Sequence, residues 1–330
     1  MAGGPEINHA IAIRELTRTY TRRIRTGPFR SSEKKSFTAL HDIDLEIEPG
    51  EVRGILGPNG AGKSTLIKIL STVLLPTSGQ ARVLGHDVAT DAAGVRRRIG
   101  IVFGGERGLY GRLTARENLD YWAALHGLSK RGRDARIGDL LERMGLGEHA
   151  DTPTDHMSRG MKQRLHLARG LVGDPEVVFL DEPTVGMDPV AAREFRTLVD
   201  DLRRDGRTIL ITTHDMREAE AVCDRITLID RGRVVGTASP GTIGQWITAF
   251  ERVEAQHVPA ELVERIRGIG GVASIDTHPN DWIQVNTDSP GAVRPVLELL
   301  VAGGVTMLRT SLPSLEDVYV AVVGDRGLSV

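Results

Sequence analysis

One glycine-rich stretch constrains this chain more than any other feature of its sequence. It fits the spacing G-x-x-x-x-G-K-[ST], the phosphate-binding loop of nucleotide hydrolases, and it consists of Gly57, Pro58, Asn59, Gly60, Ala61, Gly62, Lys63, Ser64 and Thr65. The stretch 51–56, which is typical of a short strand, precedes the loop, and a helical pattern follows it at 66–70. In that context, backbone N–H groups and the helix N-terminus bind an anion. We expect Lys63 to reach the β- and γ-phosphates of a nucleotide and the Ser64 hydroxyl to bind Mg²⁺.

Composition excludes several other classes of function. The chain has 330 residues, 40% of them hydrophobic, which is long enough for two domains. Its 42 basic and 44 acidic side chains give a net charge of −2, so nucleic acid is not an expected partner. Cys223 is the single cysteine, which excludes an internal disulfide and a thiolate metal cluster. No apolar run approaches the roughly 18 residues that span a bilayer, and the N-terminus has no secretory signal. We therefore expect a cytosolic chain that works at a membrane only through a partner.

Two further apolar strands end in chemically active side chains. The run at 177–180 leads directly into Asp181 and Glu182, and the run at 209–213 leads into His214. Buried strands of a parallel sheet can end in this way at the rim of the sheet. In nucleotide hydrolases the first acid, here Asp181, holds Mg²⁺ through water. Glu182 is then positioned to polarise an attacking water, and His214 to steady the charge on the γ-phosphate.

In this order the motifs resemble those of the ATP-binding cassette (ABC) ATPases, from about residue 11 to residue 245. The stretch 157–164, with Ser158 and Gly160, looks like the signature motif of that family. The resemblance implies that Ser158 and the helix behind it serve a γ-phosphate bound to a second subunit, that Asp188 belongs to the loop linking the two sites, and that Tyr20 stacks on adenine. It also implies a P-loop NTPase cassette of α/β class, with a mixed sheet and a helical subdomain at about 105–170.

The chain departs from the family pattern in two places. Arg159 follows the signature serine where the family usually has glycine, a form similar to the ABC-2 branch of separate drug, antibiotic and polysaccharide exporters. After the predicted strand at 99–103 the family has a glutamine that contacts Mg²⁺ and water, whereas this chain has Gly104-Gly105-Glu106-Arg107-Gly108. Either Glu106 or backbone carbonyls and water replace the glutamine, or hydrolysis is slower. We favour retained hydrolysis because Lys63, Asp181, Glu182 and His214 are all present.

Two surface segments have open interpretations. Residues 18–36 carry seven basic side chains against one acidic one, which favours a solvated loop or a patch that meets anionic lipid headgroups. We expect the preceding segment from Ile11 to be an edge strand that ends near Tyr20. Leu109 and Tyr110, before a capping box at Thr114, either form a local packing cluster or, as the resemblance implies, line the groove for a helix of a membrane subunit.

The sequence divides into an ATP-binding domain at 1–245 and an accessory domain at 246–330. The second domain has the α+β order of a ferredoxin-like unit, with a last helix starting near Ser314. Its ending is similar to the C-terminal extension of bacterial exporter ATPases. The accessory domain could support the dimer, contact the permease or regulate the ATPase, and the sequence does not favour one of these roles.

The resemblance implies the ATP-hydrolysing subunit of a two-component bacterial exporter. Two copies would dimerise around two ATP molecules with Mg²⁺ and drive a separate membrane permease from the cytoplasmic face of the membrane. The alternatives are a soluble cassette ATPase outside transport and a slow nucleotide-dependent switch. Export rests on resemblance alone.

Overall fold

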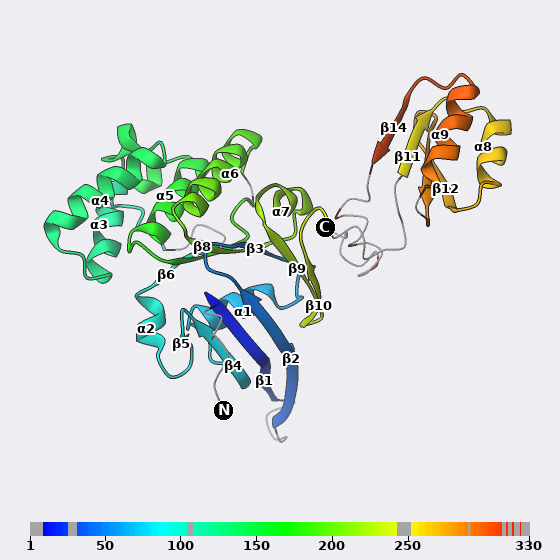
Figure 1. The fold of residues 1–330 in the computed structure, drawn as a ribbon. Helices are drawn as coiled ribbons and strands as arrows, with labels where there is room; N and C mark the ends of the chain where they lie inside the picture. Colours follow the sequence, from blue (N-terminus) through cyan, green and yellow to red (C-terminus); the bar gives the residue numbers. More distant parts are fainter. Residues whose placement is uncertain are drawn as a thin grey trace, which may run out of the picture. The chain divides into compact units, whose positions relative to one another are not determined.

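The computed structural model divides the chain into two compact units, Met1–Thr237 and Ala238–Val330 (Figure 1). The structure describes residues 9–25, 32–103, 108–185, 187–242, 252–289, 291–311, 315, 319 and 324. The division falls close to the domain boundary predicted at 245, which itself lies outside the described residues.

A six-stranded sheet forms the centre of the first unit, in the order β10-β9-β3-β8-β7-β6. Its strands are β3 (Val52–Leu56), β6 (Ile99–Phe103), β7 (Val177–Asp181), β8 (Thr208–Thr213), β9 (Arg225–Asp230) and β10 (Arg233–Ala238). The pairs β3–β8, β3–β9, β6–β7 and β7–β8 are parallel. Every residue of β3, β7 and β8 is buried, as expected of strands covered on both faces. The phosphate loop follows β3, the two acids lie at the end of β7, and His214 follows β8. Because these neighbouring strands are parallel, all of these residues lie at the same edge of the sheet.

A second, antiparallel sheet lies beside the first in the order β2-β1-β4-β5. It consists of β1 (Ile11–Arg25), β2 (Ser32–Ile47), β4 (Ser78–Val83) and β5 (His86–Asp87). The expectation that the segment from Ile11 forms an edge strand is wrong, because β1 pairs with β2 on one side and with β4 on the other. The expected loop at 18–36 is also wrong over 18–25 and 32–36, where β1 and β2 continue as a paired ribbon. Backbone hydrogen bonds hold this ribbon, so it needs no apolar side chains.

Helix α1 (Lys63–Leu70) packs between the two sheets. Its Leu66 and Ile67 are fully buried and share one apolar cluster with Leu40 of β2 and Phe179 of β7. Its N-terminus, which carries the predicted phosphate loop, is thereby fixed at the end of β3. Burial of side chains this size stabilises the fold by about 1.5–3 kcal/mol each.

The other helices of the first unit form a helical region and the crossovers of the parallel sheet (Figure 1). They are α2 (Ala92–Arg96), α3 (Ala115–Leu125), α4 (Lys130–Arg143), α5 (Arg159–Leu171), α6 (Pro189–Arg204) and α7 (Met216–Val222), with short 3₁₀ turns at Gly147–His149 and Thr154–His156. The capping box predicted at the start of α3 is confirmed: Thr114 Oγ1 accepts from Glu117 N at 3.2 Å, and Glu117 Oε2 accepts from Thr114 N at 2.8 Å. Helices α3, α4 and α5 pack on one another and make the predicted helical subdomain.

The second unit has the strand and helix order of a ferredoxin-like fold. Its elements are β11 (Arg252–Gln256), α8 (Ala260–Arg267), β12 (Val272–His278), β13 (Trp282–Thr287), α9 (Val293–Ala302) and β14 (Leu308–Ser311). The sheet order is β12-β13-β11-β14, and the three neighbouring pairs are antiparallel. The predicted fold class is confirmed. Most of the last helix expected near Ser314 lies outside the described residues.

Candidate functional site

The loop between β3 and α1 is shaped by two glycines that no other residue could replace without strain. Gly62 has φ +108°, and an added Cβ would lie 2.6 Å from Ala39 O. At Gly57 an added Cβ would lie 2.2 Å from Ile229 O. At these two positions the loop lies against the backbone of β2 and β9 with no room for a side chain, and glycine lets the loop backbone turn its N–H groups toward a ligand.

Lys63 is buried at the start of α1 and points back into the loop. Its Nζ donates to Gly57 O at 2.5 Å and lies 3.4 Å from Glu182 Oε1. The ammonium group thus occupies the space enclosed by the loop and is neutralised there by a carboxylate. A phosphate entering this space would bring several anionic oxygens to Lys63 and could replace both contacts.

The ends of β7 and β8 bring the predicted acids and the histidine together. Asp181 Oδ1 accepts a hydrogen bond from Ser64 Oγ at 3.1 Å. Glu182 Oε2 lies 2.7 Å from His214 Nδ1. Glu182 has φ +50°, the left-handed region that side chains other than glycine rarely adopt. Such strain is concentrated at functional sites, and here it directs the carboxylate toward Lys63 and His214.

A cavity of about 490 Å³ opens over this cluster. Its lining is Tyr20, Phe37, Ala39, Pro58, Asn59, Gly60, Gly62, Lys63, Ser64, Thr65, Glu182, Val185 and His214. Most of the predicted phosphate-loop residues therefore line one space together with Glu182 and His214. Gly57 and Ala61 are buried beneath it, and Asp181 lines the adjoining cavity that Ser64 also lines.

Two aromatic side chains line the same cavity. Tyr20 on β1 pairs in register with Phe37 on β2, and both rings are exposed. A planar, apolar pair beside a phosphate-binding loop suits a nucleobase, since aromatic faces stack on it. Tyr20 was predicted from the sequence, whereas Phe37 was not. Only the pairing of the two strands places Phe37 here, because the sequence pattern favoured a loop before it.

The donor set of Ser64 and Asp181 fits a magnesium ion. A hydroxyl and a carboxylate oxygen 3.1 Å apart are hard oxygen ligands, of the kind that Mg²⁺ prefers. Because this ion keeps several waters and binds phosphate oxygens, it needs few protein ligands. No group of three or more histidine, cysteine, aspartate or glutamate side chains within the described part of the chain could hold a metal ion.

Comparison with known proteins decides the family. A family model described as "ABC transporter" matches residues 40–185. The Daunorubicin resistance ATP-binding protein DrrA3 of Streptomyces coeruleorubidus is 38% identical over 303 residues, 90% of this chain and 93% of that protein. This chain belongs to the ABC transporter family.

Two further relatives agree with this assignment. The ABC transporter ATP-binding protein NatA of Bacillus subtilis is 42% identical over 203 residues, 62% of this chain and 82% of that protein. The solved dimer of the ATP-binding cassette MJ0796, bound to ADP and Pi after hydrolysis, has a TM-score of 0.61 and 28% identity, covering 69% of this chain and 98% of that one. The chain is an ABC ATPase that uses ATP with Mg²⁺.

The remaining predicted site residues of this ABC ATPase do not line the 490 Å³ cavity. Ser158 is exposed and caps α5, where its Oγ accepts from Met161 N at 3.3 Å. Asp188 is exposed and caps α6, where Oδ1 accepts from Val190 N at 2.9 Å. Gly160 lies in the first turn of α5, next to another cavity. The cassette thus brings Lys63, Ser64, Glu182 and His214 together, and leaves the signature residues elsewhere.

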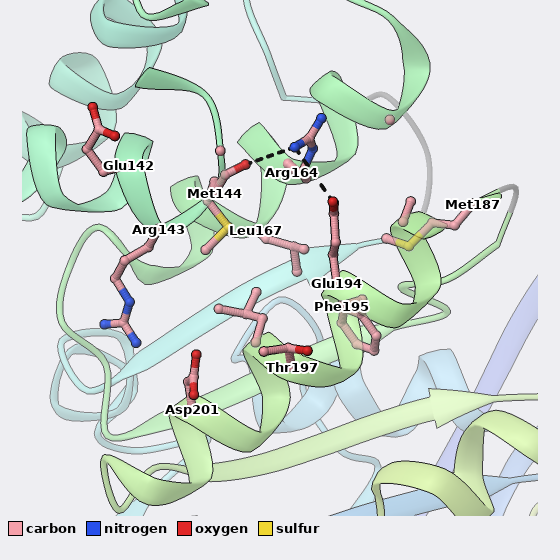
Figure 2. A pocket seen from close by; sticks show the side chains of 14 residues that line it. Glu142, Arg143, Met144, Arg164, Leu167, Met187, Glu194, Phe195, Thr197 and Asp201 are labelled. Carbon is pink, nitrogen blue, oxygen red and sulfur yellow. Dashed lines mark hydrogen bonds and ion pairs between the residues drawn. The ribbon is translucent and has the colours of Figure 1, made fainter. Parts of the chain in front are cut away.

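The cavity beside Gly160 has a volume of about 410 Å³ and lies between α4, α5 and α6 (Figure 2). Arg164 of α5 crosses it, with Nη1 3.3 Å from Met144 O and 3.7 Å from Glu194 Oε2. Leu167 and Phe195 supply buried apolar walls. Through Arg164, the helix of the signature motif is tied to both α4 and α6.

Gln163 ties the same helix to the loop that carries the acids. Its Nε2 donates to Pro183 O at 2.8 Å, one residue after Glu182. A direct hydrogen bond therefore connects α5 to the loop that follows Glu182. The sequence pattern contained Gln163 but gave no signal of this contact, which depends on how α5 packs against the end of β7.

A third cavity, of about 710 Å³, lies on the other side of the Ser64–Asp181 pair and extends to Trp122 and His126 of the helical subdomain. Tyr110 is 45% exposed and contacts Tyr121 edge-on, with ring centroids 5.0 Å apart. Leu109 is half-buried. The residues 104–107, where the family has glutamine, lie outside the described residues.

Proposed function

We propose that the chain is the ATP-hydrolysing subunit of a two-component exporter, acting as a dimer that drives a separate membrane permease. The proposal rests on one observation: the predicted site residues lie in two separate places on the chain. Lys63 and Glu182 line one cavity, while Ser158 and Asp188 are exposed and do not line it. A second copy facing the first would supply the missing signature residues to each cavity. The cassette MJ0796 is a dimer, which supports this arrangement.

Within each pocket we assign four roles. The backbone of the Gly57–Thr65 loop and Lys63 bind the β- and γ-phosphates, with Tyr20 and Phe37 around the base. Ser64 and Asp181 would hold Mg²⁺, which would supply positive charge against the phosphate oxygens. Glu182 accepts a proton from the attacking water. His214 donates to Glu182 through Nδ1, so it donates to the γ-phosphate from Nε2 as an imidazolium with both ring nitrogens protonated.

The contact between Glu182 and His214 supports the last two roles. At 2.7 Å the imidazole Nδ1 fixes the carboxylate, so that one Glu182 oxygen is held by His214 and the other faces Lys63. An entering γ-phosphate would draw Lys63 away and leave that second oxygen free to bind water. Measured hydrolysis settles the assignment: Glu182→Gln is expected to abolish turnover while ATP still binds. Wild-type turnover in that variant would contradict it.

We assign to the permease the surface of the helical subdomain next to the 710 Å³ cavity, which Ser64 and Asp181 also line. Tyr110, Tyr121 and Leu125 are exposed near Trp122, which lines the 710 Å³ cavity. Because Ser64 lines that cavity as well as the nucleotide cavity, a partner helix seated there would lie next to the Mg²⁺ ligands. Within the described residues, no helix is long and apolar enough to cross a bilayer.

Cross-linking tests this surface. Leu125→Cys introduces a thiol at a position where the native side chain is 61% exposed. The control, Val301→Cys, introduces one in the second unit, where the native side chain is 63% exposed. The native Cys223 is buried and does not compete. In membranes that contain the permease, Leu125→Cys is expected to cross-link to it and Val301→Cys is not. Equal cross-linking of both, or of neither, would contradict the assignment.

Export is supported by the relatives' names and by the Ser158–Arg159 form of the signature. DrrA3 is a daunorubicin resistance protein by name. Cells that express the chain with its permease are expected to lose a loaded organic dye faster than cells that express the Lys63→Ala variant. Equal rates of dye loss from the two kinds of cells would favour a role outside transport. The slow switch is kept as the second candidate by the missing glutamine at 104–107, and a single-turnover hydrolysis rate far below the rate of the transport cycle would support it.

A further inference from the structure

Thr212 contacts both of the acids in the nucleotide site. It is the penultimate residue of β8, fully buried, and in register with Asp181 across the parallel pair β7–β8. Its Oγ1 donates to Asp181 Oδ1 at 2.5 Å. Ser64 Oγ donates to the same oxygen at 3.1 Å. The carboxylate that is assigned to Mg²⁺ is thus held from the side of β8 as well as from the phosphate loop.

The single proton of the Thr212 hydroxyl fixes the direction of its second contact. Since this proton goes to Asp181, Oγ1 can only accept from Glu182 N, which lies 3.2 Å away. The same N–H lies 3.0 Å from the carbonyl oxygen of Thr212. One side chain therefore bridges the carboxylate of Asp181 and the backbone of Glu182.

The backbone of Glu182 needs such a restraint. At φ +50° it is in a region that persists only where the surroundings hold it. Both oxygens of Thr212 face its N–H, so they fix the turn that directs the Glu182 side chain toward His214 and Lys63. Without the hydroxyl, Asp181 could rotate and the turn at Glu182 could relax.

We propose that Thr212 is a positioning residue for ATP hydrolysis, which sets the orientation of the Mg²⁺-binding carboxylate and of the catalytic carboxylate together. This inference rests on the proposed roles of Asp181 and Glu182. It predicts that loss of the hydroxyl weakens the response to Mg²⁺ and slows turnover, while binding of ATP in the absence of Mg²⁺ is unchanged.

The experiment uses the full chain and compares Thr212→Val with the matched control Thr208→Val. Thr208 lies at the other end of β8, is also buried, and accepts one backbone hydrogen bond, from Gly50 N at 2.9 Å. ATP turnover is measured against Mg²⁺ concentration, and ATP binding by each variant is measured in the absence of Mg²⁺. Thr212→Val is expected to raise the half-saturating Mg²⁺ concentration and to lower kcat, by about 10–100-fold in combination, the usual effect of removing a partner of a metal ligand. Thr212→Ser, which keeps the hydroxyl, is expected to restore most of both.

The outcomes separate this inference from the function on which it rests. A Thr212→Val variant with the kcat and Mg²⁺ response of Thr208→Val overturns the role of Thr212 alone. Absence of hydrolysis in the wild-type chain with its permease overturns the proposed function. Should Thr212→Val fail to fold, as judged by circular dichroism, Thr212→Ala replaces it under the same criteria.

Discussion

Replacing Asn118 with alanine removes the polar side chain that closes the loop before α3. Asn118 is fully buried, and its Oδ1 accepts from Tyr110 N at 2.8 Å. Its amide nitrogen lies 3.1, 3.2, 3.0 and 2.9 Å from Tyr110 O, Leu113 O, Thr114 O and Thr154 Oγ1. Two amide hydrogens can serve only two of these acceptors fully. With the bond from Tyr110 N, the variant loses the equivalent of three hydrogen bonds, which predicts a loss of about 3 kcal/mol at about 1 kcal/mol each.

Urea unfolding followed by tryptophan fluorescence measures this loss. Trp122 lies on the same helix, and the other two tryptophans, Trp246 and Trp282, are replaced by phenylalanine so that only the helical subdomain is observed. The control is Arg116→Ala on α3, which removes an exposed ion pair of 3.4 Å and should cost less than about 1 kcal/mol. If Asn118→Ala costs no more than Arg116→Ala, the hydrogen bonds around Asn118 do not hold the loop.

Three other substitutions or treatments have definite expected outcomes. Burial raises the pKa of the Cys223 thiol to about 12, so at pH 8 the native chain should resist alkylation by iodoacetamide and should react only in denaturant; fast labelling of the native chain would show that the thiol is accessible. Gly62→Ala adds a Cβ 2.6 Å from Ala39 O at φ +108°, so a fluorescent ATP analogue should bind at least about tenfold more weakly, a change that unaltered affinity would contradict. Phe37→Ala removes an exposed aromatic ring from the cavity and should weaken analogue binding without lowering the melting temperature, whereas an equal loss of affinity for inorganic triphosphate would show that the ring does not contact the base.

The sequence predicted the parts of the site whose geometry is local. The loop from Gly57 to Thr65, the capping box at Thr114 and the helix start behind Ser158 each depend on a few consecutive residues, and the structure has a turn, a capping box and a helix at these positions. The endings of β7 and β8 were also predictable, because strands buried on both faces leave continuous apolar runs.

Features that depend on pairing between distant segments were not predicted. The outer half of the β1–β2 ribbon is mostly basic and polar, so its side chains gave no strand signal although its backbone is paired as far as Arg25 and Ser32. Phe37 reaches the nucleotide cavity only through this pairing. Likewise, Thr212 reads as one more residue of a buried strand, and its contact with Asp181 follows from the register of β7 against β8.

The claim that two chains share each ATP is tested most directly by the mass of the Glu182→Gln variant in solution. Analytical ultracentrifugation with ATP and Mg²⁺ is expected to give a dimer that reverts to monomer when nucleotide is removed. Adding Ser158→Arg places a large cation on the exposed cap of α5, which does not line the chain's own nucleotide cavity, and should abolish the dimer but leave ATP binding by each chain intact. A variant that stays monomeric with ATP, or that dimerises equally well with Ser158→Arg, would contradict the shared site.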